Sequence, residues 1–399
     1  MRVGIFLSNS NPQIGGGYTF QQDVIKDFVN QAQNINEHQF YIISGNKNID
    51  KSLIKNCGNF KILFYSENGI FNKIIENLKR HFFTSSFLAK FKGPIERLAN
   101  KNKLDMVWFV SGYCYEAMDT PYIATVFDLQ HKAQPWFPEV SNNGRWAARE
   151  LAHRHFLSRA SYVIVGTEIG RNEVELFYHV PKFRIHKLPH PSPSYILNSN
   201  NKSKSYIYKK YNLPKNFIFY PAQFWPHKNH VNLLFAFNII YKKYGLKLNL
   251  VLTGSDKGNK DHIVKIIKEL GLSNQVYILG FIPKDEMTAF YKSSTMLAYV
   301  SLCGPENLPP LEAFSAECPV LSSRIQGSEE QFGDTVLFCE PAEPKDIAEK
   351  IYLLYTNDDL KKNLVIKGKK RAKTFTSLKF SNKILKIIQD FSNIRRNWS

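Results

Sequence analysis

A proline-rich segment in the last third of the chain has the residues best suited to ligand chemistry. It reads Gly-Pro-Glu-Asn-Leu-Pro-Pro-Leu-Glu-Ala from Gly304 to Ala313. Pro309 and Pro310 suit the first turn of a helix, so we expect Glu312 in that turn, at the carboxyl edge of a parallel sheet. A carboxylate there can accept hydrogen bonds from two neighbouring hydroxyls, such as those of a ribose 2′,3′-diol. The residues alone leave open an ordinary first-turn Glu that the helix dipole favours.

A second segment combines a fixed cation with imidazoles. It reads Tyr-Pro-Ala-Gln-Phe-Trp-Pro-His-Lys-Asn-His from Tyr220 to His230, between an expected strand and an expected helix. Lys228 can hold a phosphate there, because open α/β sheets bind ligands at the carboxyl ends of their strands. A solvated lysine with capping histidines is the alternative. His227 and His230 have no carboxylate or thiol nearby in the sequence, so we expect no metal site.

Three glycines, Gly15 to Gly17, follow the first expected strand and precede the first expected helix. The backbone N–H groups of such a turn and the helix dipole can together hold an anion. The dinucleotide-binding fingerprint would need a glycine at position 20, which is Phe20, so an NAD or FAD site is disfavoured. A flexible turn that needs positive φ is the alternative.

The remaining histidines and cysteines show no pattern of a site. His153 and His155 flank Arg154 within a helical stretch, and we expect them on the surface. The five cysteines are odd in number and widely scattered, which indicates reduced thiols rather than disulfides.

The composition is that of a folded globular protein. The 399 residues suffice for two or three domains, and 43% hydrophobic with 22% charged residues argues against disorder. No apolar run approaches the roughly 18 residues of a membrane-spanning helix, and the N-terminal run is too short for a signal peptide, so we expect a cytosolic protein. A net charge of +19 would attract nucleic acid, anionic lipid or phosphorylated metabolites. An AT-rich genome, which favours Lys, Asn and Ile, explains the excess equally well.

Strand-like and helix-like runs alternate along the chain, which predicts parallel sheets crossed by helices. A stretch rich in Pro and then in polar residues, 191–205, is the best linker candidate. We therefore predict two α/β domains, 1–190 and 206–376. The last segment, 377–399, is expected to be an amphipathic helix, which by its residues alone could pack anywhere, including back on the first domain. The expected strands are 2–8, 40–44, 61–65, 106–110, 122–127, 162–166, 217–222, 248–253, 276–279, 296–300 and 319–322. The expected helices before the last segment are 18–34, 228–244, 260–270, 284–293 and one that begins at Leu308.

These motifs together resemble one enzyme family. The segment from Ser301 to Pro341 is similar to the donor-site signature of glycosyltransferase family 4, the retaining group 1 glycosyltransferases of the GT-B fold. The similarity extends to the three glycines, to Asp128 and to the segments around Lys228 and Gly280. The resemblance implies two facing Rossmann-like domains, with a nucleotide-sugar mainly on the second and the acceptor mainly on the first. Both proline-containing motifs resemble a mannosyltransferase-like subset that acts in surface polysaccharide synthesis.

The resemblance also implies roles for single residues. Glu312 would hold the donor ribose and Lys228 the diphosphate, and Asp128 and His131 would complete the catalytic set. Backbone near Gly280 would contact the base, while two glycines approach the phosphates from the first domain. The donor-binding residues implied are Gly16, Gly17, Gln223, His227, Gly254, Ile282, Gly304, Glu306, Asn307 and Leu308.

The chain departs from the family pattern in three places. The family's usual first Glu, eight positions before Glu312, is replaced by Gly304. The Arg that usually precedes the phosphate lysine is missing, with Gln223 near that position, so Lys228 would carry more of the charge stabilisation. The frequent His-Asp pair is here Phe127-Asp128.

We therefore predict a retaining glycosyltransferase that moves a hexosyl unit from a nucleoside-diphosphate sugar to a glycan or lipid-linked glycan. Because no pair of aspartates is separated by one residue, we expect neither a metal nor another cofactor, with charge met by Lys228 and helix N-termini. The alternatives are a GT-B nucleotide-sugar epimerase and a non-catalytic polyanion-binding protein. No nucleic acid is expected, because the sequence lacks a basic-aromatic repeat suited to stacking bases.

A basic and aromatic segment, residues 72–103, suggests a membrane contact. It has eight Lys and Arg residues against two Glu, interleaved with Phe and Leu. Such a segment could dock on an anionic membrane and meet a lipid-linked acceptor. A core-facing aromatic stripe with a solvated basic face is an equally good interpretation.

Overall fold

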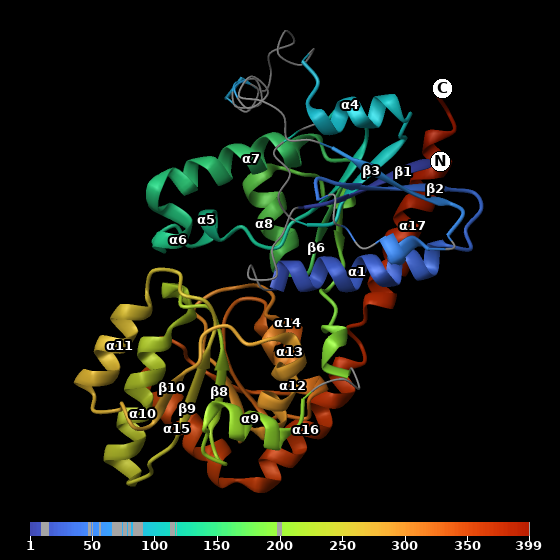
Figure 1. Ribbon diagram of the computed structural model, residues 1–399. Helices are drawn as coiled ribbons and strands as arrows, with labels where there is room; N and C mark the ends of the chain where they lie inside the picture. Colours follow the sequence, from blue (N-terminus) through green and yellow to red (C-terminus); the bar gives the residue numbers. More distant parts are fainter. Residues whose placement is uncertain are drawn as a thin grey trace. The chain divides into compact units, whose positions relative to one another are not determined.

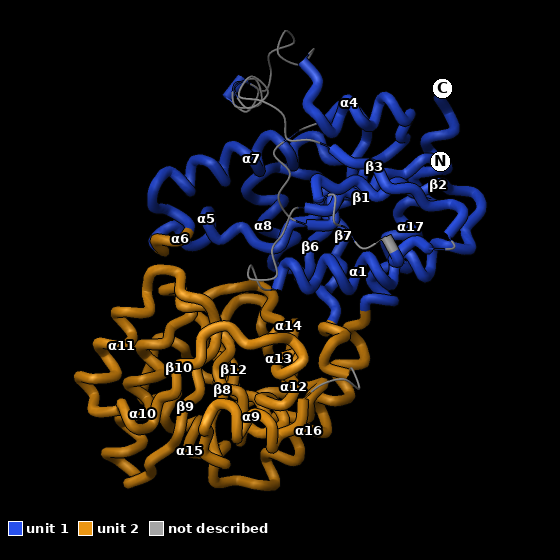
Figure 2. Tube along the Cα trace, in the orientation of Figure 1, with its two compact units in different colours: residues 1–136, 140–191, 377–399 blue, residues 137–139, 192–376 orange. Residues whose placement is uncertain are grey.

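The computed structural model divides the chain into two compact units (Figure 2). Unit 1 comprises residues 1–136, 140–191 and 377–399, and unit 2 comprises residues 137–139 and 192–376. The residues that the structure describes are 1–8, 16–46, 49, 51–55, 57–65, 74, 78, 81–82, 91–111, 116, 118–197 and 202–398.

Unit 1 is built on a seven-stranded parallel sheet in the order β3-β2-β1-β4-β5-β6-β7 (Figure 1). Its strands are β1 (Arg2–Leu7), β2 (Gln39–Ser44), β3 (Phe60–Phe64), β4 (Met106–Phe109), β5 (Tyr122–Thr125), β6 (Tyr162–Val165) and β7 (Ile185–Lys187). The α-helices are α1 (Gly16–Ala32), α4 (Pro94–Lys101), α5 (Gln130–Ala133), α7 (Arg145–Arg159), α8 (Glu168–Tyr178) and α17 (Ser377–Arg395). A further helix, α6 (Pro138–Ser141), crosses the boundary between the units.

The sheet of unit 1 forms because its strands are apolar on both sides, as parallel strands covered by helices must be. In β1, Val3 and Ile5 pack into a core with α1 and α17, whereas Phe6 packs into a second core with α4, α7 and α8. The last helix thus packs on the first unit, a position that its amphipathic sequence allowed.

Unit 2 has a six-stranded parallel sheet in the order β10-β9-β8-β11-β12-β13. Its strands are β8 (Ile218–Pro221), β9 (Leu250–Thr253), β10 (Val276–Ile278), β11 (Met296–Tyr299), β12 (Val320–Ser323) and β13 (Leu337–Cys339). Its α-helices are α9 (Lys204–Tyr211), α10 (His230–Tyr244), α11 (Lys260–Glu269), α12 (Lys284–Ser293), α13 (Leu308–Ser315), α14 (Ser328–Phe332), α15 (Pro344–Thr356) and α16 (Asp358–Ala372). One hydrophobic core joins this sheet to the helices on it.

The strand order reverses once in each sheet, between β1 and β4 in unit 1 and between β8 and β11 in unit 2. At such a point the connections leave the sheet in opposite directions, which opens a crevice at the carboxyl ends of the two strands. The residues after β8 and β11 include Lys228 and the segment from Gly304 to Asn307. The fold therefore brings the two sequence motifs of unit 2 to one edge of its sheet.

Two expectations about local structure were wrong. The helix predicted from Lys228 begins at His230, because Asn229 has a φ of 60° and separates it from a short 3-10 turn, Pro226–Lys228. Glu312 is the fifth residue of α13 and lies beyond the first turn, because the helix already begins at Leu308. Two strands, β7 and β13, were also missed, and each has only three residues.

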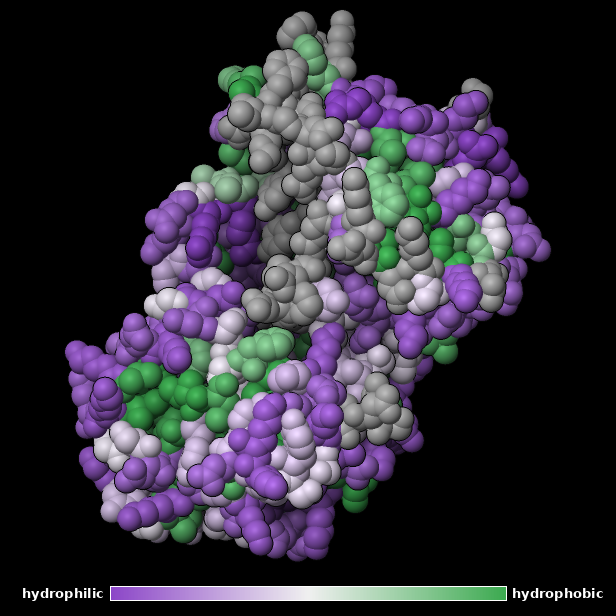
Figure 3. All heavy atoms as spheres, in the orientation of Figure 1, coloured by the Kyte–Doolittle hydropathy of each residue, from purple (hydrophilic) through white to green (hydrophobic). Residues whose placement is uncertain are grey.

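On the face shown in Figure 3, hydrophilic residues cover most of unit 2, and apolar residues gather over α10 and α11. Among the described residues, no helix is long and apolar enough to cross a bilayer. About half of the basic segment proposed for membrane contact, including residues 83–90, lies outside the described residues, as does Gly15.

Candidate active site

Lys228 is connected across the strand-order reversal of unit 2. Its Nζ donates a 2.9 Å hydrogen bond to the hydroxyl of Tyr299, the last residue of β11, and lies 3.5 Å from Ser301 Oγ. The next residue, Asn229, donates from Nδ2 to the carbonyls of Val300 at 2.9 Å and Pro341 at 2.6 Å. The loop after β8 is thus fastened to the loop after β11, and this holds a cation at the crevice.

Tyr299 also connects Lys228 to the start of α13. Its hydroxyl donates a 3.0 Å hydrogen bond to Asn307 Oδ1, and Asn307 Nδ2 donates to the carbonyl of Gly304 at 2.9 Å. Gln331 of α14 bonds both the N–H and the carbonyl of Asn307, at 2.9 and 3.1 Å. Asn307 is therefore a buried junction between Lys228 and the loop in front of α13.

Gly304, which stands where the family resembled by the sequence usually has a Glu, has a backbone that disfavours any side chain. Gly304 has a φ of 121°, which a side chain rarely tolerates, and a Cβ there would lie 2.9 Å from Asn307 Oδ1. A Glu at position 304 would therefore strain the backbone and displace Asn307 from its bonds.

Glu312 lies inside unit 2, held by a tyrosine. The hydroxyl of Tyr291, from α12, donates a 2.6 Å hydrogen bond to Glu312 Oε2, and both residues are buried. Burial and the Glu312 carboxylate both raise the pKa of Tyr291, so the hydroxyl stays protonated and donates.

The other donor-binding candidates of unit 2 follow β8, β9 and β10. Gly254, with a φ of 141°, packs so closely that a Cβ would lie 2.4 Å from the carbonyl of Ala222, and its N–H donates to Gly280 at 2.7 Å. Gln223 bonds Ser255 Oγ at 3.1 Å and Trp225 Nε1 at 3.0 Å. These contacts bring together the backbone segments that follow three adjacent strands, β8, β9 and β10.

The last four candidates of unit 2 differ in exposure. The side chain of Ile282 is buried in the core, so only its backbone could meet a ligand. Glu306 and Leu308 are half-buried on either side of Asn307. His227 bonds Glu139, and this bond lowers the pKa of Glu139 although burial alone would raise it. Among the described residues, no group of three or more potential metal ligands comes together.

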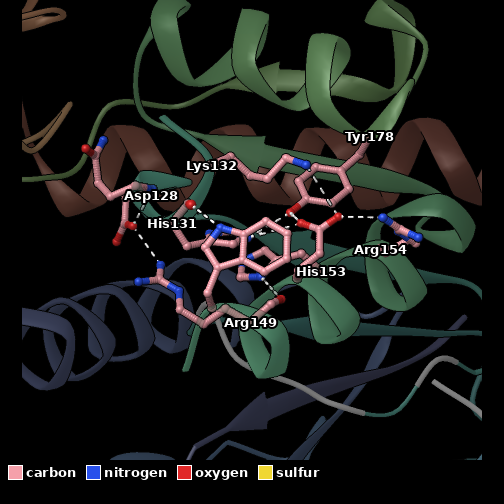
Figure 4. A network of polar contacts seen from close by, with 10 residues as sticks. Asp128, His131, Lys132, Arg149, His153, Arg154 and Tyr178 are labelled. Atoms are coloured by element: carbon pink, nitrogen blue, oxygen red, sulfur yellow. Dashed lines mark hydrogen bonds and ion pairs between the residues drawn. The ribbon is translucent and has the colours of Figure 1, made fainter. Parts of the chain in front are cut away.

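In unit 1, Asp128 forms an ion pair that the sequence did not indicate. Arg149 Nη2, from α7, lies 2.7 Å from Asp128 Oδ1, and the backbone N–H of Gln130 donates to the same oxygen at 3.0 Å (Figure 4). Burial would raise the pKa of Asp128, but the Arg149 guanidinium and the hydrogen bonds outweigh it and lower the pKa. Asp128 is therefore held as an oriented carboxylate.

A second carboxylate, Glu150, organises the network around His131. Glu150 accepts from Tyr178 at 2.9 Å and from Arg154 at 2.9 Å, and Lys132 Nζ lies 3.5 Å away (Figure 4). His131 Nε2 lies 3.1 Å from the Tyr178 hydroxyl. The side chains of α5, α7 and α8 are thereby fixed relative to one another.

His131 and His153 lie inside this network and hold no charge at neutral pH. Burial, with a contribution from His153, lowers the pKa of His131 to about 4, and burial also lowers the pKa of His153. His153 Nδ1 lies 2.8 Å from the carbonyl of Arg149. The surface position predicted for His153 and His155 is wrong, since both are buried where α7 packs on the rest of unit 1.

Glu173 of α8 is a third carboxyl group in this region. It is 9% exposed, and its Oε2 has no hydrogen-bond partner among the described residues. Burial, with a contribution from the Asp128 charge, raises the pKa of Glu173 to about 7. Unit 1 thus places a carboxylate and a readily protonated carboxyl within electrostatic range of each other.

The remaining unit 1 candidates, Gly16 and Gly17, open α1. A Cβ on Gly17 would lie 3.6 Å from the ring of Phe127, which packs edge-on against Phe20 and His190. An aromatic cluster therefore occupies the position where the family has the His of its His-Asp pair, next to the glycines.

Comparison with known proteins finds a family match within the second half of the chain. Residues 204–371 match the family model described as glycosyl transferases group 1. Residues 204–371 are called the group 1 domain below, after the family whose model they match.

Two of the similar curated proteins are bacterial mannosyltransferases. O-antigen chain mannosyltransferase B of Escherichia coli is 22% identical over 240 residues, which are 60% of this chain and 63% of that protein. O-antigen chain mannosyltransferase RfbU of Salmonella typhimurium is 24% identical over 189 residues, 47% of this chain and 49% of that protein. The chain thus spans less than two thirds of the length of these relatives.

Solved structures resemble the whole chain. A glycosyltransferase from Rickettsia africae has a TM-score of 0.68 at 16% identity, covering 98% of both chains. HepE of Anabaena, solved in complex with UDP and glucose, has a TM-score of 0.67 at 14% identity, covering 98% of this chain and all of that one. These likenesses confirm the predicted GT-B fold, with two Rossmann-like units.

The group 1 domain contains Lys228, Glu312 and the candidate donor-binding residues from Gln223 to Leu308, and unit 1 brings Asp128 and His131 into one network. Their roles stay predictions. Sequence reasoning missed Tyr299, Tyr291, Gln331, Arg149, Tyr178 and Glu173. For Tyr299 a signal existed, because it ends a strand two residues before the motif from Ser301 begins. The other five residues lie on helices, and they meet their partners only because these helices pack against the rest of their unit.

Proposed function

We propose that the protein is a retaining glycosyltransferase that moves a hexosyl unit from a nucleoside-diphosphate sugar to a glycan or lipid-linked glycan during bacterial surface polysaccharide synthesis. The observation that carries the proposal is the cation of Lys228, held by Tyr299 at the strand-order reversal of the group 1 domain. The two O-antigen mannosyltransferases support the polysaccharide context and make mannose the first sugar to test. The HepE complex with UDP and glucose supports a nucleotide-sugar donor.

In the proposed reaction the protein stabilises the charge on the leaving diphosphate and supplies no nucleophile of its own. The bond between C1 of the sugar and the diphosphate oxygen breaks, and the acceptor oxygen bonds C1 from the same face. The acceptor proton passes to the departing diphosphate. Lys228 offsets the negative charge that develops on the diphosphate, while Glu312 holds the ribose hydroxyls. In this proposal no divalent cation or other cofactor takes part.

The proposed place of action is the cytoplasmic face of an anionic membrane, where lipid-linked acceptors are presented. The net charge of +19 and the basic residues of segment 72–103 support this contact.

Donor binding is the first test. GDP-mannose, UDP-glucose and other nucleotide-sugars are added to the purified protein and its melting temperature is followed. A ligand at 100 times its Kd adds about 2.7 kcal/mol to the stability of the protein that binds it. Stabilisation by one donor, followed by transfer to a glycan acceptor with unchanged anomeric configuration, is expected. Conversion of the donor to another nucleotide-sugar without acceptor would identify an epimerase, and binding of no donor would contradict both enzymes.

A further inference from the structure

Asp128 is fixed through one carboxylate oxygen and open at the other. Its two hydrogen bonds among the described residues, from the N–H of Gln130 and from Arg149, both reach Oδ1. No group in the described part of the chain donates to Oδ2, and the side chain is 28% exposed. A carboxylate in this state presents an oriented acceptor to a hydroxyl that arrives from solvent.

Trp146 lies one helical turn before Arg149, on the same face of α7. Its Nε1 donates a 2.6 Å hydrogen bond to the carbonyl of His131, three residues after Asp128. The residue is nevertheless 37% exposed. The indole is thus anchored by its polar edge while part of its ring surface meets solvent.

These groups have complementary binding chemistry. A sugar ring offers a face of C–H groups, which packs on an aromatic ring, and an edge of hydroxyls, which bond to carboxylate and guanidinium groups. The indole and the ion pair are both held in place before a ligand binds, so ordering these side chains costs little entropy on binding. Lys132 Nζ lies over the Trp146 ring, 5.7 Å from its centre, so the sugar would stack on the part of the indole that this cation leaves exposed.

We propose that Trp146, Asp128 and Arg149 form a carbohydrate subsite on unit 1, in which the indole stacks against one sugar ring and the ion pair binds its hydroxyls. The inference rests on the proposed function for its biological role, since the sugar would belong to the glycan acceptor. Binding to this subsite alone needs neither the donor nor turnover.

A purely structural role for Trp146 makes a different prediction. If the indole only fastens α7 to α5, it acts through the hydrogen bond from Nε1 to the carbonyl of His131. Trp146→Phe removes this bond and keeps an aromatic face, whereas Trp146→Ala removes both. Phe183, 78% exposed elsewhere on unit 1, offers the control Phe183→Ala.

The test is saturation-transfer NMR on the full-length protein with methyl α-mannoside, methyl α-glucoside and methyl α-galactoside. We expect at least one glycoside to receive saturation from the parent. The signal should fall about tenfold in Trp146→Ala and several-fold in Asp128→Asn, and stay within about threefold in Trp146→Phe and Phe183→Ala. Melting temperatures show that each variant is folded.

Three results would overturn the subsite: no signal from any glycoside with the parent, an equal signal from the parent and Trp146→Ala, or an equal loss in Trp146→Phe and Trp146→Ala. The donor melting assay is run on the same samples. If no nucleotide-sugar binds while the glycoside signals follow the expected order, the proposed function fails and the subsite stands. If a nucleotide-sugar binds while Trp146→Ala gives the same glycoside signals as the parent, the subsite fails and the proposed function stands.

Discussion

The hydroxyl of Tyr291 lies 2.6 Å from Oε2 of Glu312, deep in the group 1 domain, where both side chains are buried. A buried carboxylate is costly unless it is hydrogen-bonded, and this bond meets part of that cost while it sets the direction of the carboxylate. The role proposed for Glu312 therefore depends on a residue from the preceding helix.

Glu312→Gln should lower kcat/KM by roughly ten- to a hundredfold and leave folding intact. The substitution keeps the size of the side chain but weakens charge-assisted hydrogen bonds to the ribose, which contribute about 1.5 to 3 kcal/mol. Initial rates at varied donor concentration measure this. Tyr291→Phe is the matched variant, and it should cause a smaller loss because the carboxylate remains. Parental donor affinity and turnover in Glu312→Gln would remove Glu312 from the site.

Lys228→Ala should depress turnover more than it changes the melting temperature, because the cation is most useful as the diphosphate departs. EDTA added to the purified enzyme should change the rate of transfer little. Loss of activity with EDTA and rescue by magnesium or manganese would show that a cation shares the role assigned to Lys228. The search for its ligands would then begin at Asp128, His131 and Glu306.

Tyr299→Phe tests whether the position of the Lys228 cation matters in addition to its charge. The variant loses the bonds to Lys228 Nζ and Asn307 Oδ1 and keeps the ring that lies 5.4 Å from Nζ. We expect kcat to fall several-fold, with less effect than Lys228→Ala. Ser315→Ala, on the same domain, serves as a control that also removes one hydroxyl bond. Equal kcat in Tyr299→Phe and the parent would rule out positioning by Tyr299.

Glu173 should make the protein less stable as the pH rises. Its pKa is raised from 4.5 to about 7 in the folded state, so between these values the folded chain keeps a proton that the unfolded chain releases. The stabilisation is complete below about pH 4.5 and is lost as pH rises through about 7, a change of about 3 kcal/mol. The melting temperature of Glu173→Gln minus that of the parent should thus be larger at pH 8 than at pH 5. His131 and His153, present in both proteins, cancel in this comparison. An identical pH dependence in both would contradict the raised pKa.

The proposed membrane contact should depend on lipid charge and on salt. Each basic residue near an anionic surface contributes on the order of 1 kcal/mol, and salt screens this attraction. In vesicle sedimentation, more protein should pellet with anionic than with neutral vesicles, and high salt should remove the difference. Equal recovery with both kinds of vesicle would mean that the basic excess serves another purpose.

Local patterns in the sequence were sufficient where structure depends on near neighbours. The helices from Lys284 to Ser293 and from Leu308 were predicted with their observed starts, because charge, proline and apolar spacing act within one or two turns. The short strands β7 and β13 were missed because three residues carry too little alternation to detect.

The sequence by itself determined the alternation of strands and helices, the two motifs at strand ends and, through them, the resemblance to group 1 glycosyltransferases. Only the tertiary structure decided which side chains meet. Arg149 reaches Asp128 across 21 positions, Tyr291 reaches Glu312 from another helix, and Tyr299 joins Lys228 to Asn307 because the strand order reverses beside β8. The burial of His153 and the raised pKa of Glu173 have the same origin. Helix packing sets how far a side chain is shielded from water and how close its partner lies, and no local pattern in the chain encodes either.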